Sequence, residues 1–151
     1  MATLALTGGM KGIPTRKAGS TFIVEREIDL QAEGVATADV VQALNIEAGW
    51  FVHKTLVEIQ RIAAGTSGSL IVGDGADPNG FDTAVDLKGA VGTVSSTGLV
   101  LAEGAPNTLV DAYAAGKYYT AADTLDLTAT LHADLTDKGK VKVIALVTSF
   151  N

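Results

Sequence analysis

The strongest candidate for a metal site in this sequence is a short acidic stretch rich in glycine. Four side chains with oxygen donors fall within nine residues: Asp74, Asp77, Asn79 and Asp82. Hard cations such as Ca²⁺ prefer such oxygens as ligands. The spacing is not that of an EF-hand, and the bidentate glutamate of that motif is missing. We favour the alternative, a surface hairpin loop in which Asp and Asn side chains cap their own turns.

Catalytic chemistry has few residues available. The chain contains no cysteine and two histidines, His53 and His132. Nucleophilic catalysis would need a serine or threonine, a histidine base and an orienting carboxylate, and no Gly-x-Ser-x-Gly elbow is present. The glycine-rich stretches match neither a P-loop nor a dinucleotide fingerprint. We therefore predict a protein that is not an enzyme and holds no cofactor.

The paired tyrosines of Lys117-Tyr118-Tyr119 are the best candidates for a contact surface. Tyrosine brings a large area to an interface at low cost in conformational entropy. Successive residues of a strand face opposite ways. We therefore expect one ring in the core and the other at a subunit contact, or stacked on a sugar ring.

The composition narrows the class of protein. A chain of 151 residues fits one domain, and 47% hydrophobic residues with 5% aromatics and 17 glycines favour strands and turns over a helical bundle. The net charge of −6 is poorly suited to nucleic acid. No apolar run approaches 18 residues, so no membrane span is predicted. The N-terminus lacks a secretory pattern, and we expect a protein that stays or assembles where it is made.

Residues 1–20 differ from the rest and form a predicted N-terminal arm. They hold three basic residues and no acid, whereas the remainder holds 8 basic and 17 acidic residues, so charges of +3 and −9 combine to −6. One interpretation is an arm that docks on a neighbouring subunit or on an acidic partner surface through Lys11, Ile13, Arg16 and Lys17. The other is a frayed tail whose charges are incidental.

Period-two alternation dominates the remaining sequence, residues 21–151. It is clearest at Thr124–Leu131, where Leu125, Leu127, Ala129 and Leu131 share one face. A polar turn at 134–139 and a second strand from Lys140 to Val147 follow, and we predict that the two strands pair as a hairpin. Further strands are expected at 22–28, 40–46, 70–72 and 91–101, with a strand or a helical turn at 109–115. Together these segments predict an all-β fold of about eight strands, an antiparallel β-sandwich or jelly roll.

The stretch from Trp50 to Ala64 allows two interpretations. Val52, Leu56, Ile59 and Ala63 follow a helical period, but the segment is rich in β-branched residues, which favour a sheet. Phe51, Val57 and Ile59 would also share one face of a strand. We predict a strand.

Three segments resemble small bacteriophage virion proteins: residues 38–52 (ADVVQALNIEAGWFV), 72–81 (VGDGADPNGF) and 116–127 (GKYYTAADTLDL). Proteins of this kind are similar to jelly-roll capsid decoration, or cement, proteins, and the likeness extends over about residues 21–150. It carries no catalytic motif.

The resemblance implies a virion protein made in the host cytoplasm and bound to the outer capsid surface. There it would clamp neighbouring subunits of the major capsid protein. It also implies a symmetric homo-oligomer, with a trimer favoured and a dimer possible. The contact residues would then be those of the arm together with Tyr118 and Tyr119.

Two other classes of protein stay open. One is a receptor- or carbohydrate-binding module of a tail or head fibre, which would use Trp50, Tyr118 and Tyr119, and the other is a hydrolase.

Overall fold

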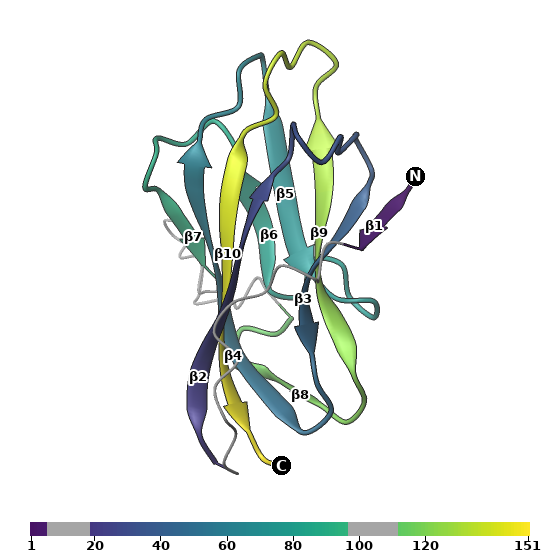
Figure 1. Cartoon of the computed structure of the whole chain (residues 1–151), viewed down its shortest axis with the longest axis vertical. Coiled ribbons are helices and arrows are strands. Elements are labelled where there is room, and N and C mark those ends of the chain that lie inside the picture. The colour runs from purple at the N-terminus through teal and green to yellow at the C-terminus, as the bar shows by residue number, and fades with distance from the viewer. Residues whose placement is uncertain (6–18, 97–111) are drawn as a thin grey trace, which may run out of the picture.

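The chain is entirely β in its described parts. The computed structural model describes residues 1–5, 19–96 and 112–151, which form ten strands and no helix, so no described helix could cross a membrane (Figure 1). The strands are β1 (Thr3–Ala5), β2 (Thr21–Asp29), β3 (Val40–Ile46), β4 (Trp50–Arg61), β5 (Gly68–Gly73), β6 (Asp82–Asp86), β7 (Val94–Ser96), β8 (Lys117–Tyr119), β9 (Asp123–Leu131) and β10 (Lys140–Ser149). The predicted strands at 22–28, 40–46 and 70–72 are confirmed.

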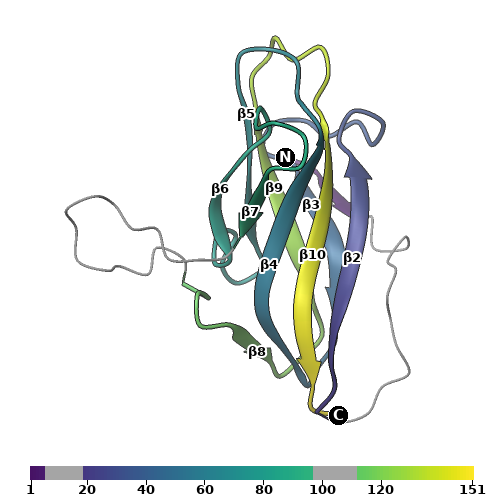
Figure 2. The same ribbon diagram turned by 90° about the vertical axis from the view of Figure 1, so that its left-hand side faces the viewer.

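Two sheets stack face to face, and Figure 2 looks onto one of them, with β4, β10 and β2 in front of β9 and β3. Sheet A has the order β1-β3-β9-β5-β6, and sheet B has the order β2-β10-β4-β7, with β8 also paired to β4. Their inner faces form one apolar core in which Trp50, Leu127 and Val143 are at most 1% exposed. Alternating residues supply this core because every second side chain of a strand points inward. The predicted β-sandwich is confirmed. It has ten described strands instead of about eight, and three of them, β1, β7 and β8, are only three residues long.

The predicted hairpin between residues 124–131 and 140–147 is wrong. β9 pairs with β3 and β5 in sheet A, whereas β10 pairs with β2 and β4 in sheet B. Residues 132–139 therefore cross from one sheet to the other at the end of the sandwich (Figure 1). Eight residues easily span the roughly 10 Å between packed sheets. Alternation shows that both segments are strands but does not show which strands they pair with.

The strand prediction for residues 50–64 is confirmed, because β4 runs from Trp50 to Arg61. The expectation that Phe51 shares a face with Val57 and Ile59 is wrong. An irregularity opposite Leu146 and Val147 places His53 and Lys54 outward in succession, so the inward face continues from Val52 to Thr55. Such a bulge reverses the alternation along the strand. Phe51 consequently lies on the outer face, while Val57 and Ile59 are buried.

The first residues of the predicted arm are part of sheet A. β1 pairs in parallel with β3, in register from Thr3 opposite Val40 to Ala5 opposite Gln42. The buried Asp39 carboxylate accepts hydrogen bonds from the backbone N–H groups of Ala2 and Ala36, at 2.9 and 2.8 Å, and these bonds lower its pKa.

Some predicted features lie outside the described residues. These are Lys11, Ile13, Arg16 and Lys17 of the arm, residues 97–101 of the strand predicted at 91–101, and residues 109–111 of the segment predicted at 109–115. The described part of the first segment contains the short strand β7. Residues 112–115 form a turn, in which the Gly116 N–H donates to the Tyr113 carbonyl at 2.8 Å.

Candidate interaction surface

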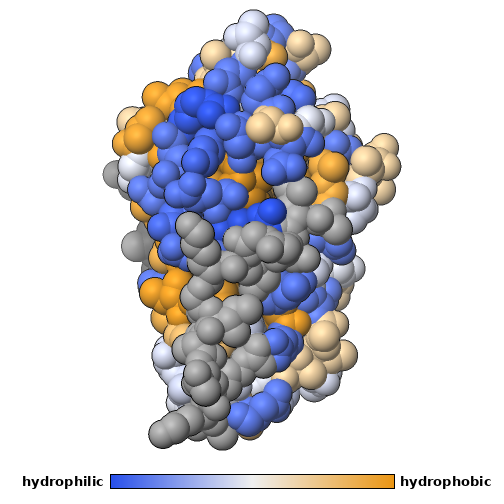
Figure 3. Space-filling model, viewed as in Figure 1, coloured by the Kyte–Doolittle hydropathy of each residue, from blue (hydrophilic) through white to orange (hydrophobic). Residues whose placement is uncertain are grey.

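The outer face of sheet B is divided into a charged half and an apolar half. In the charged half, acids on β2 face bases on β10 and β4. Lys140 contacts Glu27 at 2.7 Å, and Lys142 contacts Glu25 at 3.1 Å. Figure 3 shows hydrophilic side chains gathered over the upper parts of these strands. Since each of these charges has a partner within the chain, this half has little electrostatic attraction left for another molecule.

Arg61 completes the charged half by joining two carboxylates. It donates to Asp29 at 2.9 Å through both terminal nitrogens, and to Asp137 at 2.8 Å through Nε. The hydrogen bonds from Arg61 lower the pKa of Asp29 to about 2. Asp137 lies in the connection between β9 and β10, so this network fixes the crossing between the sheets to the end of β4.

The other half carries five apolar side chains, Ile23, Phe51, Leu146, Tyr118 and Phe150, which we call the apolar patch. Polar groups lie among them, with Lys54 opposite Leu146 and the His53 ring against that of Phe51. Leu146 of β10 lies opposite Ile23 of β2, and Tyr118 of β8 lies opposite Phe51 of β4. The Tyr118 and Phe150 rings meet edge to face, with centroids 6.1 Å apart. Ile23, Tyr118 and Phe150 are 50%, 49% and 59% exposed. A patch of this kind on a rigid sheet is typical of a protein contact surface.

Alternation along β8 decides which tyrosine is available. Tyr118 points outward and Tyr119 is 3% exposed, which confirms the prediction of one buried and one exposed ring. Gly116 sets the approach of this segment to β4. It has a φ of +90°, and a Cβ there would lie 2.5 Å from carbons of the Phe51 ring. Glycine is therefore required both by the backbone conformation and by the close contact.

A buried ionic cluster holds β8 against the loop that follows β5. The Asp74 side chain is fully buried and accepts hydrogen bonds from the Tyr119 hydroxyl at 2.6 Å, from the Tyr113 hydroxyl at 3.3 Å and from Lys117 Nζ. Burial alone would raise the pKa of Asp74, but the bonds from Lys117 and Tyr119 outweigh it and lower the pKa. Burial and the nearby Asp74 carboxylate raise the pKa of Tyr119. The cluster is thus a neutralised ion pair that positions β8, and with it Tyr118.

The other predicted metal ligands serve local turns. Asp74 Oδ1 accepts from the backbone N–H groups of Ala76 and Asp77, and Asp82 Oδ1 accepts from that of Ala84 at 3.0 Å. Asp82 also accepts a bond from the Ser95 hydroxyl at 2.5 Å. Within residues 1–5, 19–96 and 112–151, no group of three His, Asp or Glu side chains is arranged to hold a metal ion. This geometry matches turn capping, the interpretation favoured from the sequence.

The two histidines contact hydroxyl or carboxylate groups in different places. His53 Nε2 lies 2.7 Å from Thr148 Oγ1, which lies 2.7 Å from Thr21 Oγ1. This is a base beside a hydroxyl, but the hydroxyl belongs to a residue only 8% exposed, and no carboxylate in the described part of the chain orients the ring. His132 Nδ1 contacts Asp134 at 2.6 Å in the connection after β9.

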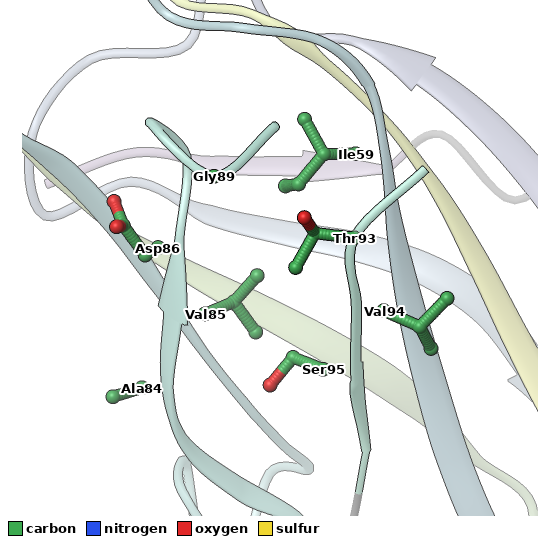
Figure 4. Close-up of a pocket in the computed structure, with 8 residues that line it drawn as sticks. All are labelled: Ile59, Ala84, Val85, Asp86, Gly89, Thr93, Val94 and Ser95. Atoms are coloured by element: carbon green, nitrogen blue, oxygen red, sulfur yellow. The ribbon is translucent and has the colours of Figure 1, made fainter. Parts of the chain in front are cut away.

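A groove of about 230 Å³ separates β6 from the segment that leads into β7 (Figure 4). Val85 and Ser95 lie between the two segments, Ile59 closes one side, and Asp86 supplies a single carboxylate. Among the described residues that line the groove, Asp86 is the single titratable group.

Comparison with protein-family models gives no match, and no curated protein matches the chain. Solved structures do match it. A chain in the "Capsid of Ralstonia phage GP4" superposes with a TM-score of 0.63 at 14% identity, covering 91% of this chain and 90% of that chain. This chain shares the fold of phage capsid chains.

Two further structures agree with the first. A chain in the "Cyanophage Pam1 capsid asymmetric unit" has a TM-score of 0.60 at 14% identity and 90% coverage of both chains. A chain in the "Acidic stable capsid structure of Helicobacter pylori bacteriophage KHP30" has a TM-score of 0.51 at 12% identity and covers 93% of this chain and 92% of that chain. Coverage is nearly complete in both directions, so the likeness concerns a whole sandwich rather than a shared motif.

Sequence reasoning found Tyr118 but missed most of the patch around it. The sequence places Phe51 on the same strand face as Val57 and Ile59, because the bulge in β4 carries no obvious sequence signal. Ile23 and Leu146 alternate with buried residues, so their outward direction could have been read from Phe22 and Val24 or from Val147. The pairing of Asp74 with Lys117, 43 residues apart, had no sequence signal at all.

Proposed function

We propose that this protein is a structural component of a bacteriophage head, a decoration or cement protein on the outer capsid surface. The likeness to chains in three phage capsid structures, over at least 90% of this chain, is the observation that carries the proposal. The chain's own features support it. A β-sandwich, paired charges on the outer face of sheet B and an apolar patch suit a protein that holds other proteins together.

The apolar patch is the proposed contact with the major capsid protein. Three of its side chains are about half exposed, and an aromatic side chain buries about 150–250 Å², so the patch offers on the order of 300–400 Å². A stable complex buries about 800 Å² on each partner. The patch therefore has to act together with other contacts, for which we propose Lys11, Ile13, Arg16 and Lys17 of the arm. Assembly as a homo-oligomer, a trimer or a dimer, would multiply these weak contacts.

The proposal is tested with heads that lack this protein. Purified protein is added to such heads, attachment is measured by cosedimentation, and the temperature of DNA release is followed with a DNA-binding dye. We expect attachment and a higher release temperature. Heads that neither bind the protein nor gain stability would contradict the proposed function.

Matched variants locate the contact. Tyr118→Ala and Phe150→Ala should weaken attachment with little change in melting temperature, because both side chains are largely exposed. Val91→Ser is the control, since Val91 is 63% exposed but lies outside the patch. If Tyr118→Ala and Phe150→Ala attach to heads as well as Val91→Ser does, the apolar patch is not the contact with the capsid.

One observation keeps a second candidate, a carbohydrate-binding module of a fibre. The exposed Tyr118 ring next to Phe150 offers an aromatic surface of the type on which sugars stack. The case is weaker than the sequence indicated, because Trp50 and Tyr119 are 1% and 3% exposed. A glycan array with the Tyr118→Ala variant as control separates the two candidates.

A further inference from the structure

The edge strand β2 carries an arginine on its core-facing side. Arg26 lies opposite Val143 of β10, whose side chain is fully buried, and it follows the alternation of the buried Val24 and Ile28. Residues directly opposite each other on paired strands point to the same side of the sheet. The Arg26 side chain therefore enters the space between the two sheets, where every second residue of β2 is otherwise apolar.

The Arg26 guanidinium has an unsatisfied buried nitrogen. Nη1 is buried and has no hydrogen-bond partner, and in the described parts of the chain no carboxylate pairs with this side chain. Arg61, in contrast, binds two carboxylates. A guanidinium stays charged at every physiological pH, and a buried donor without an acceptor is costly. Native proteins rarely leave such a group without a partner.

Arg26 lies on an edge strand of the described sandwich. β2 is the edge of sheet B and pairs with β10 alone among the described strands. It lies beside β3, near the corresponding edge of sheet A (Figure 2). The outward backbone groups of an edge strand are available to a further strand, and an extended segment that adds to such an edge is a common form of peptide recognition.

Protection of the edge is the ordinary reason for an inward charge on an edge strand. A protecting arginine works by reaching water with its charged end. Arg26 is partly exposed, so this role is compatible with part of the side chain, but it leaves the buried Nη1 without an acceptor among the described residues.

We infer that Arg26 and the edge of β2 that the described strands leave unpaired form a docking site for an extended segment of a neighbouring virion protein that carries a carboxylate. This inference rests on the proposed function. The planar guanidinium fork matches a carboxylate, which would satisfy the charge and the buried nitrogen together. The arm of this chain cannot supply it, because residues 1–20 contain no Asp or Glu. Nucleic-acid phosphate is disfavoured by the charge of −9 on residues 21–151.

The test compares Arg26→Met with the natural protein in attachment to heads that lack it and in thermal melting. Loss of one partner from a buried, hydrogen-bonded charge pair weakens binding strongly, so we expect attachment to fall at least about thirtyfold. The melting temperature should stay the same or rise, because an uncompensated buried charge is removed. Arg26→Lys, which keeps the charge but loses the fork, should bind with intermediate affinity.

Arg61→Met is the matched control. It removes the same kind of side chain from a satisfied network, so it should lower the melting temperature and leave attachment nearly unchanged. Attachment of Arg26→Met equal to that of the natural protein would overturn the inference, and so would a change confined to self-association, measured by size exclusion with light scattering. If the natural protein itself fails to bind heads, the proposed function fails instead.

Discussion

Replacing Asp74 by asparagine tests whether the buried cluster determines the position of β8. Asparagine keeps the shape and one acceptor oxygen for the turn but removes the charge that Lys117 requires. The Asp74 side chain is fully buried and that of Lys117 is 22% exposed. Removing one partner of a buried ion pair costs about 3–5 kcal/mol, and partial hydration of Lys117 points to the lower end, about 3 kcal/mol. At about 2–4 °C per kcal/mol for a chain of this size, the melting temperature should fall by about 6–12 °C.

The assay is thermal and urea unfolding at pH 7, with a double-mutant cycle through Lys117→Met. We expect the two changes to be non-additive, because the second variant no longer leaves an unpaired charge. Asp77→Asn is the control in the same loop. Among the described residues its carboxylate accepts a bond only from the Asn79 N–H, at 3.4 Å and exposed, so it should change stability little. Because the cluster holds β8, Asp74→Asn should also weaken attachment to heads through Tyr118.

The pH dependence provides an independent check. The pKa of Asp74 is lower in the folded protein than its ordinary value of 3.8. A carboxyl group with a lowered folded-state pKa stabilises the protein above its unfolded-state pKa, and this contribution is lost as the pH falls through the folded-state value. The difference between the natural protein and Asp74→Asn should therefore be constant near neutral pH and shrink below about pH 4. Equal stability of the two proteins at pH 7 would refute the argument.

Three other predictions test the fold, the approach of β8 and the arm. Leu127→Asp should prevent folding, because this fully buried residue lies on β9 between β3 and β5; a soluble variant with a cooperative melting curve would disprove it. Gly116→Ala should cost about 1–3 kcal/mol in urea unfolding through its positive φ and its contact with Phe51. Gly92→Ala is the control: Gly92 has a φ of +86° and open space around it, so this variant measures the cost of the positive φ without a steric contact. Deleting residues 1–18 should weaken attachment to heads while the remaining chain still melts cooperatively, and full affinity would refute a role for the arm.

Local pattern was sufficient for the longer strands of this fold, whereas the short strands β1 and β6 were not predicted. Alternation at residues 124–131 and β-branched residues in 50–64 predicted strands that the structure contains, and the composition predicted an all-β sandwich. The same alternation predicted that one of Tyr118 and Tyr119 would be buried. These features depend on the period of the backbone and on the burial of one face, both of which are written in neighbouring residues.

Pairing and contact were decided only by the tertiary structure. The sequence places β9 and β10 next to each other, but the connection between them is long enough to reach either sheet, so packing of the whole core selects the partners. The bulge at His53, the meeting of Asp74 with Lys117 and the unpaired Arg26 between the sheets all depend on residues far apart in the chain. A periodic pattern predicts which side chains point toward the core. Which residues they contact in the core depends on how the two sheets pack against each other.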